Sequence, residues 1–145
     1  MNIRKMTADD LPAIVPLATQ LGYECSYEQL VDRFSMRLHD ETNALFVGED
    51  SVLIVAFMQV HETWTLMTGR RAEINAIVVD EKMRGKGYGR EMMDVAENWA
   101  RNRSLPKLRL GSRTSRSATH EFYKKYGFSV EKTWFIFSKY LKQGI

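Results

Sequence analysis

Cysteine is almost absent from this chain of 145 residues, which contains only Cys25. A single cysteine cannot form an internal disulfide, and it excludes the cysteine clusters that bind structural zinc. Long apolar runs are also absent, because the longest, Val52–Met58, is far shorter than the roughly 20 residues of a membrane-spanning helix. The N-terminal residues lead into a polar segment and not into an apolar signal-peptide core. We therefore expect a cytoplasmic protein.

No internal repeat, low-complexity tract or linker rich in Pro, Gly and Ser divides the sequence. A chain of this length can build a hydrophobic core without disulfides or bound metal. These features predict one domain over residues 1–145 and no metal site.

Positive charge is concentrated in one part of the sequence. Residues 81–116 contain ten basic and four acidic side chains, so this stretch carries a formal charge of +6 and the rest of the chain −3. Such an excess suggests an anionic partner, either a phosphorylated small molecule or a nucleic acid. A solvated surface is the more common meaning of scattered Lys and Arg, so the charge alone does not choose among these.

The first half of the sequence predicts a strand followed by two helices. Asn2–Lys5 is short enough for an edge strand. A helix is expected from the cap at Thr7–Asp10 towards Gly22, and Pro16 should kink or shorten it. Ser26–Gln29 has the spacing of a capping box and predicts the start of a second helix.

The rest of the sequence first takes the pattern of strands. A hairpin with a turn at Gly48–Ser51 is expected, then a loop at Thr63–Arg71 and a strand at Glu73–Val79, with Ile74, Ala76 and Val78 on one face. Tyr88–Arg103 has the clearest helical stripe. The remaining expected elements are a strand at Lys107–Leu110, a helix at Ser117–Tyr126 closed by Gly127, and strands at Phe128–Val130 and Trp134–Leu141.

The expected order is therefore β-α-α-β-β-β-α-β-α-β. This order predicts an α/β fold with a mixed central sheet and helices on both faces.

A glycine-rich loop joins the strand that ends at Val79 to the best helix of the sequence. Arg84, Gly85, Lys86, Gly87, Tyr88, Gly89 and Arg90 form this loop and the first turn of the helix. Glycines let backbone N–H groups turn towards one point, and a helix N-terminus adds unpaired donors and a favourable dipole. The setting favours phosphate binding over an ordinary turn. The spacing of the glycines fits neither a Rossmann fingerprint nor a Walker loop.

The segment Arg84-x-x-Gly87-x-Gly89 resembles the acetyl-CoA-binding motif of the GNAT superfamily of N-acetyltransferases. Phe122-Tyr123-Lys124-Lys125-Tyr126-Gly127-Phe128 resembles a second conserved segment of that family, and the element order from Ile3 to Leu141 is also the family's. The resemblance implies a GNAT-like fold, acetyl-CoA as cosubstrate and transfer of the acetyl group to a primary amine of a small molecule or peptide by direct attack.

The resemblance also implies the places of the cosubstrate. The pantetheine arm is expected along the backbone of Ile77, Val78 and Val79, and the pyrophosphate on the N–H groups of residues 85–90. Val79 N–H is the family-based candidate for stabilising the thioester oxygen. Many family members carry Asn where this chain has Arg116 and Ala where it has Thr119, and Arg116 is an alternative contact for a CoA phosphate.

Two catalytic residues are expected. Tyr123 is the candidate proton donor to the departing thiolate, with Tyr126 as a rival and core packing as the other interpretation. Glu73, at the head of the central strand, is the candidate base, directly or through water; a solvated strand-end acid is an equal alternative. His61, Glu62 and His120 are weaker candidates for the base.

The amine acceptor is poorly encoded in the sequence. Tyr23, Glu24 and Tyr27 lie between the first two expected helices, where the family builds the wall of its acceptor site. Trp64 and Thr65 lie in the expected loop Thr63–Arg71, a candidate for the other side. A non-catalytic acyl-CoA-sensing or partner-binding module with the same fold is the alternative function. A nucleic-acid-binding domain is disfavoured, because no recognition helix or array of stacking aromatics accompanies the charge. The aromatic segment Trp134–Leu141 suits either the core or the surface of a homodimer.

Overall fold

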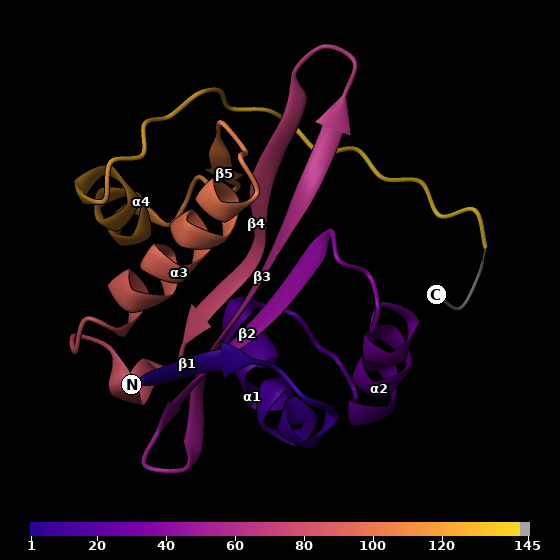
Figure 1. Ribbon diagram of the computed structural model, residues 1–145, viewed down its shortest axis with the longest axis vertical. Helices are drawn as coiled ribbons and strands as arrows, with labels where there is room; N and C mark the ends of the chain where they lie inside the picture. Colours follow the sequence, from indigo (N-terminus) through magenta and orange to yellow (C-terminus); the bar gives the residue numbers. More distant parts are fainter. Residues whose placement is uncertain (143–145) are drawn as a thin grey trace. The chain divides into compact units, whose positions relative to one another are not determined.

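A computed structural model describes residues 1–142, and its elements are labelled in Figure 1. Internal contacts divide the chain into a first unit, Met1–Gly111, and a second unit that begins at Ser112, and each is described by itself. The first unit contains β1 (Asn2–Lys5), α1 (Leu11–Leu21), α2 (Tyr27–Met36), β2 (Asn43–Asp50), β3 (Leu53–Thr65), β4 (Gly69–Val79), α3 (Tyr88–Asn102) and β5 (Leu108–Leu110), with short 3₁₀ turns at Ala8–Asp10 and Glu81–Met83. The second contains α4 (Ser117–Lys125).

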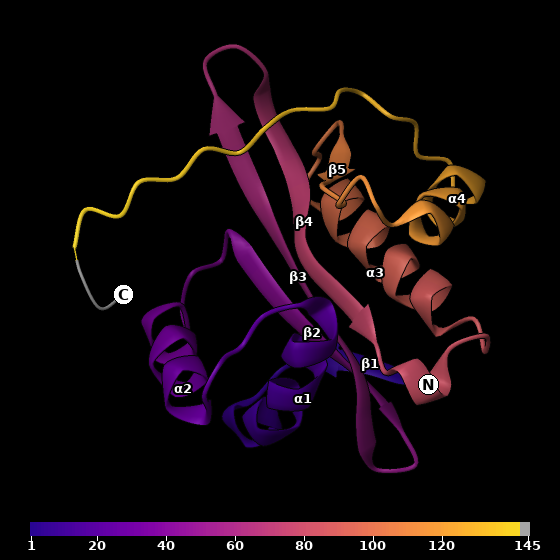
Figure 2. The same cartoon turned by 180° about the vertical axis from the view of Figure 1, so that it is seen from behind.

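The first unit is built on one mixed sheet with the strand order β1-β2-β3-β4-β5. Neighbouring strands from β1 to β4 are antiparallel, and β5 pairs with β4 in parallel. Short hairpin connections account for the pairs β2–β3 and β3–β4, whereas α1 and α2 lie between β1 and β2, and the parallel pair needs the crossover through α3. The mixed sheet with helices on both faces confirms the predicted α/β fold, and Figure 2 shows the same arrangement from behind.

The sheet is covered on both faces, and its core lies in the middle strands. Val47, Phe57 and Val78 stand in one row across β2, β3 and β4 and pack against Ile14 and Leu17 of α1. Side chains alternate between the two faces of a strand, so the neighbouring buried residues of β3 face the other side. The fully buried methionines of α3, Met92 and Met93, lie on the apolar side of that helix.

Helix boundaries in the first unit follow local capping signals. Ser26 Oγ accepts a hydrogen bond from Gln29 N (3.1 Å), and Gln29 Oε1 accepts one from Ser26 N (3.0 Å), which confirms the predicted capping box. Gly22 ends α1 in the left-handed conformation, with φ 104°. Of the two effects expected of Pro16, a kink or a shorter helix, the shortening does not occur, because α1 continues past Pro16 to Leu21.

The two hairpins differ from the prediction in where they turn. Gly48 and Glu49 belong to β2, where the register shifts, and the turn lies at Ser51 and Val52. The expected loop Thr63–Arg71 is mostly strand, because β3 and β4 pair as far as Thr65 and Gly69. Cross-strand pairing extends β4 through Gly69, Arg70 and Arg71, which have no strand preference of their own, opposite Thr63–Thr65 of β3.

A β-bulge interrupts β4 at Asn75. Gln59 of β3 pairs with Ala76, but the next residue, Val60, pairs with Ile74. An extra residue in one strand changes the alternation of faces. The prediction that Ile74 shares a face with Ala76 and Val78 was therefore wrong, and of these three only Ala76 and Val78 contact the cluster around Phe57.

The second unit has α4 and an extended segment. Gly127 follows the helix with φ 102°, its N–H bonds to Lys124 O, and Phe128 N–H bonds to Tyr123 O. This pattern is a Schellman motif, and it confirms the predicted left-handed cap. The strands expected at Phe128–Val130 and Trp134–Leu141 are absent from the described residues, because no neighbouring strand pairs with these segments there. Nowhere within residues 1–142 is a helix both long and apolar enough to cross a bilayer.

Candidate functional site

The carboxyl half of β4 has one free edge in the described part of the chain. β5 pairs only with Ala72, Glu73 and Ile74, so the ladder on that side stops just before the bulge. On the other side, Asp80 N–H donates to Val55 O of β3 (2.7 Å). Backbone groups alternate in direction along a strand. The N–H and C=O groups of Val79 and Ile77 therefore point to the free edge, where an extended ligand would add like a strand.

The side chains of this part of β4 also serve the core. Val78 is buried against Phe57, whereas Ile77 and Val79 are half-buried. Packing of the side chains leaves the backbone of the free edge accessible. Of the three residues predicted to hold a pantetheine arm, Ile77 and Val79 thus have backbone donors and acceptors at the free edge, whereas the backbone of Val78 faces β3.

The loop after β4 adopts a conformation that requires glycine. Gly85 and Gly87 both have φ 82°, in the left-handed region that residues other than Gly, Asn and Asp rarely adopt. A Cβ at either position would meet no atom within 4 Å. The backbone angle is the constraint, and the space beside both glycines is open to a ligand.

The N-terminus of α3 lacks a side-chain cap. Gly87 is the N-cap residue, and it has no side chain to accept hydrogen bonds from the first turn at Tyr88, Gly89 and Arg90. Unpaired N–H groups and the positive end of the helix dipole favour an anion at this point. Arg84, Lys86 and Arg90 are exposed around it and add positive charge.

Three hydrogen bonds hold the two ends of the loop. Gln20 of α1 accepts a hydrogen bond from Glu81 N (2.9 Å), and Asp80 Oδ1 accepts one from Lys82 N (3.1 Å). At the helix end, Tyr88 donates its hydroxyl hydrogen to Asp50 Oδ2 (2.5 Å). The loop is therefore tied to α1 and to the β2–β3 hairpin.

Glu73, the predicted base, lies between two arginines. Its Oε1 is 3.2 Å from Arg109 Nε and 3.7 Å from Arg71 Nε. Both guanidinium groups are largely buried, with 16% and 12% of their side chains exposed, respectively. The carboxylate is therefore oriented by ion pairs with two guanidinium groups.

A second polar pair lies beside Glu73 in the ladder. His61 is the cross-strand partner of Glu73, and its Nδ1 lies 2.5 Å from Asn75 Oδ1 at the bulge. Glu62, by contrast, is paired with Arg70 at 2.9 Å and has Arg103 at 3.5 Å. Glu62 is thus engaged by two arginines, as Glu73 is.

Tyr123, the predicted proton donor, belongs to the second unit. Burial raises the pKa of its hydroxyl, an effect that the positive charge of Arg116 opposes. The ring makes edge contacts with Phe122 (5.6 Å between centroids) and Phe128 (5.9 Å). Tyr123 therefore packs against two neighbouring aromatic rings and keeps its hydroxyl protonated at neutral pH.

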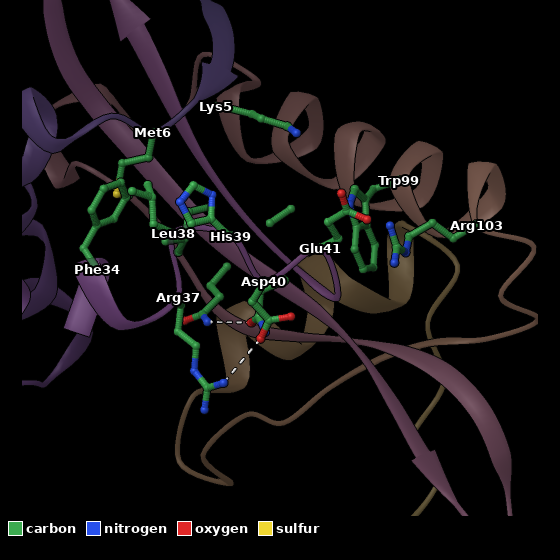
Figure 3. A pocket seen from close by; sticks show the side chains of 14 residues that line it. Lys5, Met6, Phe34, Arg37, Leu38, His39, Asp40, Glu41, Trp99 and Arg103 are labelled. Atoms are coloured by element: carbon green, nitrogen blue, oxygen red, sulfur yellow. Dashed lines mark hydrogen bonds and ion pairs between the residues drawn. The ribbon is translucent and has the colours of Figure 1, made fainter.

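A pocket of about 470 Å³ lies elsewhere in the first unit (Figure 3). It is bordered by Phe34 of α2, by Leu38 after that helix, by the start of β2, by Trp99 of α3 and by Arg103 after that helix. None of the predicted site residues lines it. In Figure 3 the Asp40 carboxylate is already engaged by Arg37 and Asn43.

The residues that support the loop carry no signal in the sequence. Gln20 and Asp50 are 61 and 38 residues away from their partners, and neither belongs to a motif. The sequence predicts Asn75 within a regular strand, whereas the structure has a bulge there and Asn75 is exposed. The residues of β4 and the loop do lie consecutively in the first unit, as their sequence order predicts.

Comparison with known proteins gives the family of the chain. The model of the family described as Acetyltransferase (GNAT) family matches residues 11–128. An uncharacterized N-acetyltransferase of Bacillus subtilis, YhdJ, is 29% identical over 125 residues, which are 86% of this chain and 87% of the relative. The aminoalkylphosphonate N-acetyltransferase of Salmonella typhimurium is 29% identical over 145 residues, with 97% and 91% covered.

Solved structures show the same fold. The glucosamine-6-phosphate N-acetyltransferase of Arabidopsis thaliana has a TM-score of 0.80 and 24% identity, and the match covers 97% of this chain and 98% of that one. At this identity the likeness concerns the fold alone.

Proposed function

Because the chain belongs to the GNAT family of acetyltransferases, we propose that it transfers the acetyl group of acetyl-CoA to a primary amine by direct attack. The family uses acetyl-CoA as cosubstrate. The uncapped N-terminus of α3 after two left-handed glycines is the observation that carries the proposal for this chain. Open space beside both glycines fits a phosphate group, and the free edge of β4 fits an extended arm.

The binding residues act mostly through their backbone. N–H groups from Gly85 to Arg90 bind the pyrophosphate, assisted by the charges of Arg84 and Lys86. Ile77, Val78 and Val79 hold the pantetheine arm along the free edge of β4. Val79 N–H, which points to that edge, stabilises the thioester oxygen as it gains negative charge.

Acetyl transfer needs a proton removed from the amine and a proton given to the leaving sulfur. Glu73, whose carboxylate two ion pairs orient, takes the first proton, directly or through a water. Tyr123 gives the second, and burial favours the protonated form of its hydroxyl. Bound acetyl-CoA supplies the activated acyl group, and the protein orients the amine against it.

A primary amine on a small molecule or a peptide is the proposed acceptor. The Salmonella relative is named for aminoalkylphosphonates, which are primary amines that carry an anionic group. Acceptors of this kind therefore belong in the first set of compounds to try.

Release of CoA on addition of amines tests the function. The purified protein is mixed with acetyl-CoA and a panel of aminoalkylphosphonates, polyamines, aminoglycosides, amino acids and peptides with free N-termini, and free thiol is measured. We expect thiol release with one class well above the rate without an amine. Tight binding of acetyl-CoA with no release for any member of the panel would favour the alternative, a non-catalytic acyl-CoA-sensing module.

A further inference from the structure

The tip of the β2–β3 hairpin contacts the first turn of α3 through one acidic side chain. Asp50 Oδ2 accepts the hydroxyl hydrogen of Tyr88 at 2.5 Å, and Ser51 donates to Asp50 Oδ1 at 3.2 Å. Both Asp50 and Tyr88 are half-buried. A hydrogen bond from a hydroxyl to a carboxylate is charge-assisted, and such bonds are stronger than those between neutral groups.

The hairpin that presents Asp50 has an unusual backbone. Ser51 and Val52 both have positive φ, 50° and 66°, which is a turn that suits Asn and Gly. A β-branched residue in the left-handed region is a costly choice that persists only where other contacts determine the conformation. The bond from Tyr88 to the neighbouring Asp50 is such a contact.

Electrostatics connect the same carboxylate to the loop. The Tyr88 hydroxyl and the charge of Lys86 lower the pKa of Asp50, so the group is a carboxylate at neutral pH. Asp50 in turn raises the pKa of Tyr88, with a smaller effect from Glu91. The Asp50 carboxylate would repel a phosphate bound at the N-terminus of α3, so Asp50 does not itself bind the ligand.

We propose that Asp50 is a positioning residue for the phosphate site: by holding the Tyr88 hydroxyl, it fixes the direction of the first turn of α3. The N–H groups of Tyr88, Gly89 and Arg90 are then aimed at one point before the ligand arrives. Pre-orientation lowers the cost of ordering these groups on binding. Since the phosphate site belongs to the proposed function, this role rests on that function.

Binding of CoA to matched variants tests the role. Tyr88→Phe and Asp50→Ala both remove the hydrogen bond, and we expect each to raise the Kd of CoA roughly tenfold. Asp50→Asn keeps an oxygen acceptor and removes the charge, so it should bind CoA at least as tightly as the wild type. With the amine found in the thiol-release panel, the loss in Asp50→Ala should appear as a higher KM for acetyl-CoA and not as a lower kcat at saturating acetyl-CoA.

Two exposed residues provide controls for these substitutions. Tyr27→Phe and Asp32→Ala make the same chemical changes on α2, outside the loop, and should leave the Kd of CoA unchanged. Wild-type affinity of Tyr88→Phe would overturn the role of Asp50, and so would a loss of affinity in Asp50→Asn equal to that in Asp50→Ala. Failure of the wild type itself to bind CoA would instead refute the proposed function.

A measurement without ligand examines the contact itself. Ultraviolet titration of the tyrosines in the wild type and in Tyr88→Phe identifies the titration of Tyr88. We expect its pKa to lie above the ordinary value and to fall towards it in Asp50→Ala. A titration of Tyr88 that is the same with and without the Asp50 carboxylate would contradict the contact.

Discussion

Gly87 combines a backbone conformation that favours glycine with open space for a ligand. Its φ of 82° is unfavourable for alanine, although a Cβ at this position would meet no atom within 4 Å. Gly87→Ala should therefore lower the free energy of unfolding by about 1–2 kcal/mol through strain alone. Its Cβ would also enter the space assigned to the phosphate, so the affinity for CoA should fall by roughly tenfold or more.

Gly111→Ala is the matched control for this change. Gly111 also has open space around it, but its φ is not positive. Urea unfolding and calorimetry should find it close to the wild type in stability and in CoA affinity. Equal effects of the two substitutions would contradict a special role of the Gly87 conformation.

Tyr123 carries the chemical prediction at the same scale. Tyr123→Phe keeps the ring that packs against Phe122 and Phe128 but removes the hydroxyl. We expect kcat to fall by about 10²-fold or more, with the Kd of CoA unchanged, because general acids contribute on this order. Tyr126→Phe is the control and should keep its turnover. Unchanged turnover of Tyr123→Phe across the pH range would remove Tyr123 from the mechanism.

At the scale of elements, the β2–β3 hairpin stores strain that a substitution can relieve. Val52 has φ 66° and a side chain that is 90% exposed, so little packing is lost when it is replaced. Val52→Asn should raise the free energy of unfolding by roughly 0.5–1 kcal/mol, because Asn tolerates the left-handed region. Val130→Asn, exposed and without positive φ, should not stabilise the protein. A Val52→Asn variant that melts below the wild type would contradict the strained turn.

Elements whose signals lie within a few residues could be predicted from the sequence. The capping box at Ser26 and the left-handed cap at Gly127 each depend on contacts between neighbours in the chain. Strand ends and the bulge at Asn75 depend on a partner strand, and the expected strands after Gly127 had none to pair with in the described residues. The loop of the candidate site was found through its glycines, whereas Asp50 acts across 38 residues and left no local signal.

For the whole molecule, one ion-pair group ties the N-terminal strand to its surroundings. Arg4 of β1 donates two hydrogen bonds to Asp10 (2.7 and 2.8 Å) and one to Glu49 of β2. Asp10 is only 6% exposed, and hydrogen bonding with Arg4 lowers the pKa of its carboxyl. Asp10→Asn should therefore cost roughly 1–3 kcal/mol of stability at pH 7.

The pH dependence of this cost has a definite sign. A folded-state pKa below the unfolded value stabilises the protein above that unfolded value, which is about 3.9 for Asp. The difference in stability between wild type and Asp10→Asn should be full at pH 7 and shrink as the pH falls below about 4. Urea unfolding at several pH values measures it. A difference that does not change over this range would mean that the charge of Asp10 contributes nothing.

Binding of the donor tests the account as a whole most directly. Isothermal titration of the wild-type protein with acetyl-CoA should show one molecule bound per chain. Affinity should fall in Gly87→Ala and persist in Gly111→Ala, because only the first changes the loop that precedes α3. Absence of any binding of acetyl-CoA or CoA to the folded wild type would contradict the phosphate site, and with it the proposed acetyl transfer.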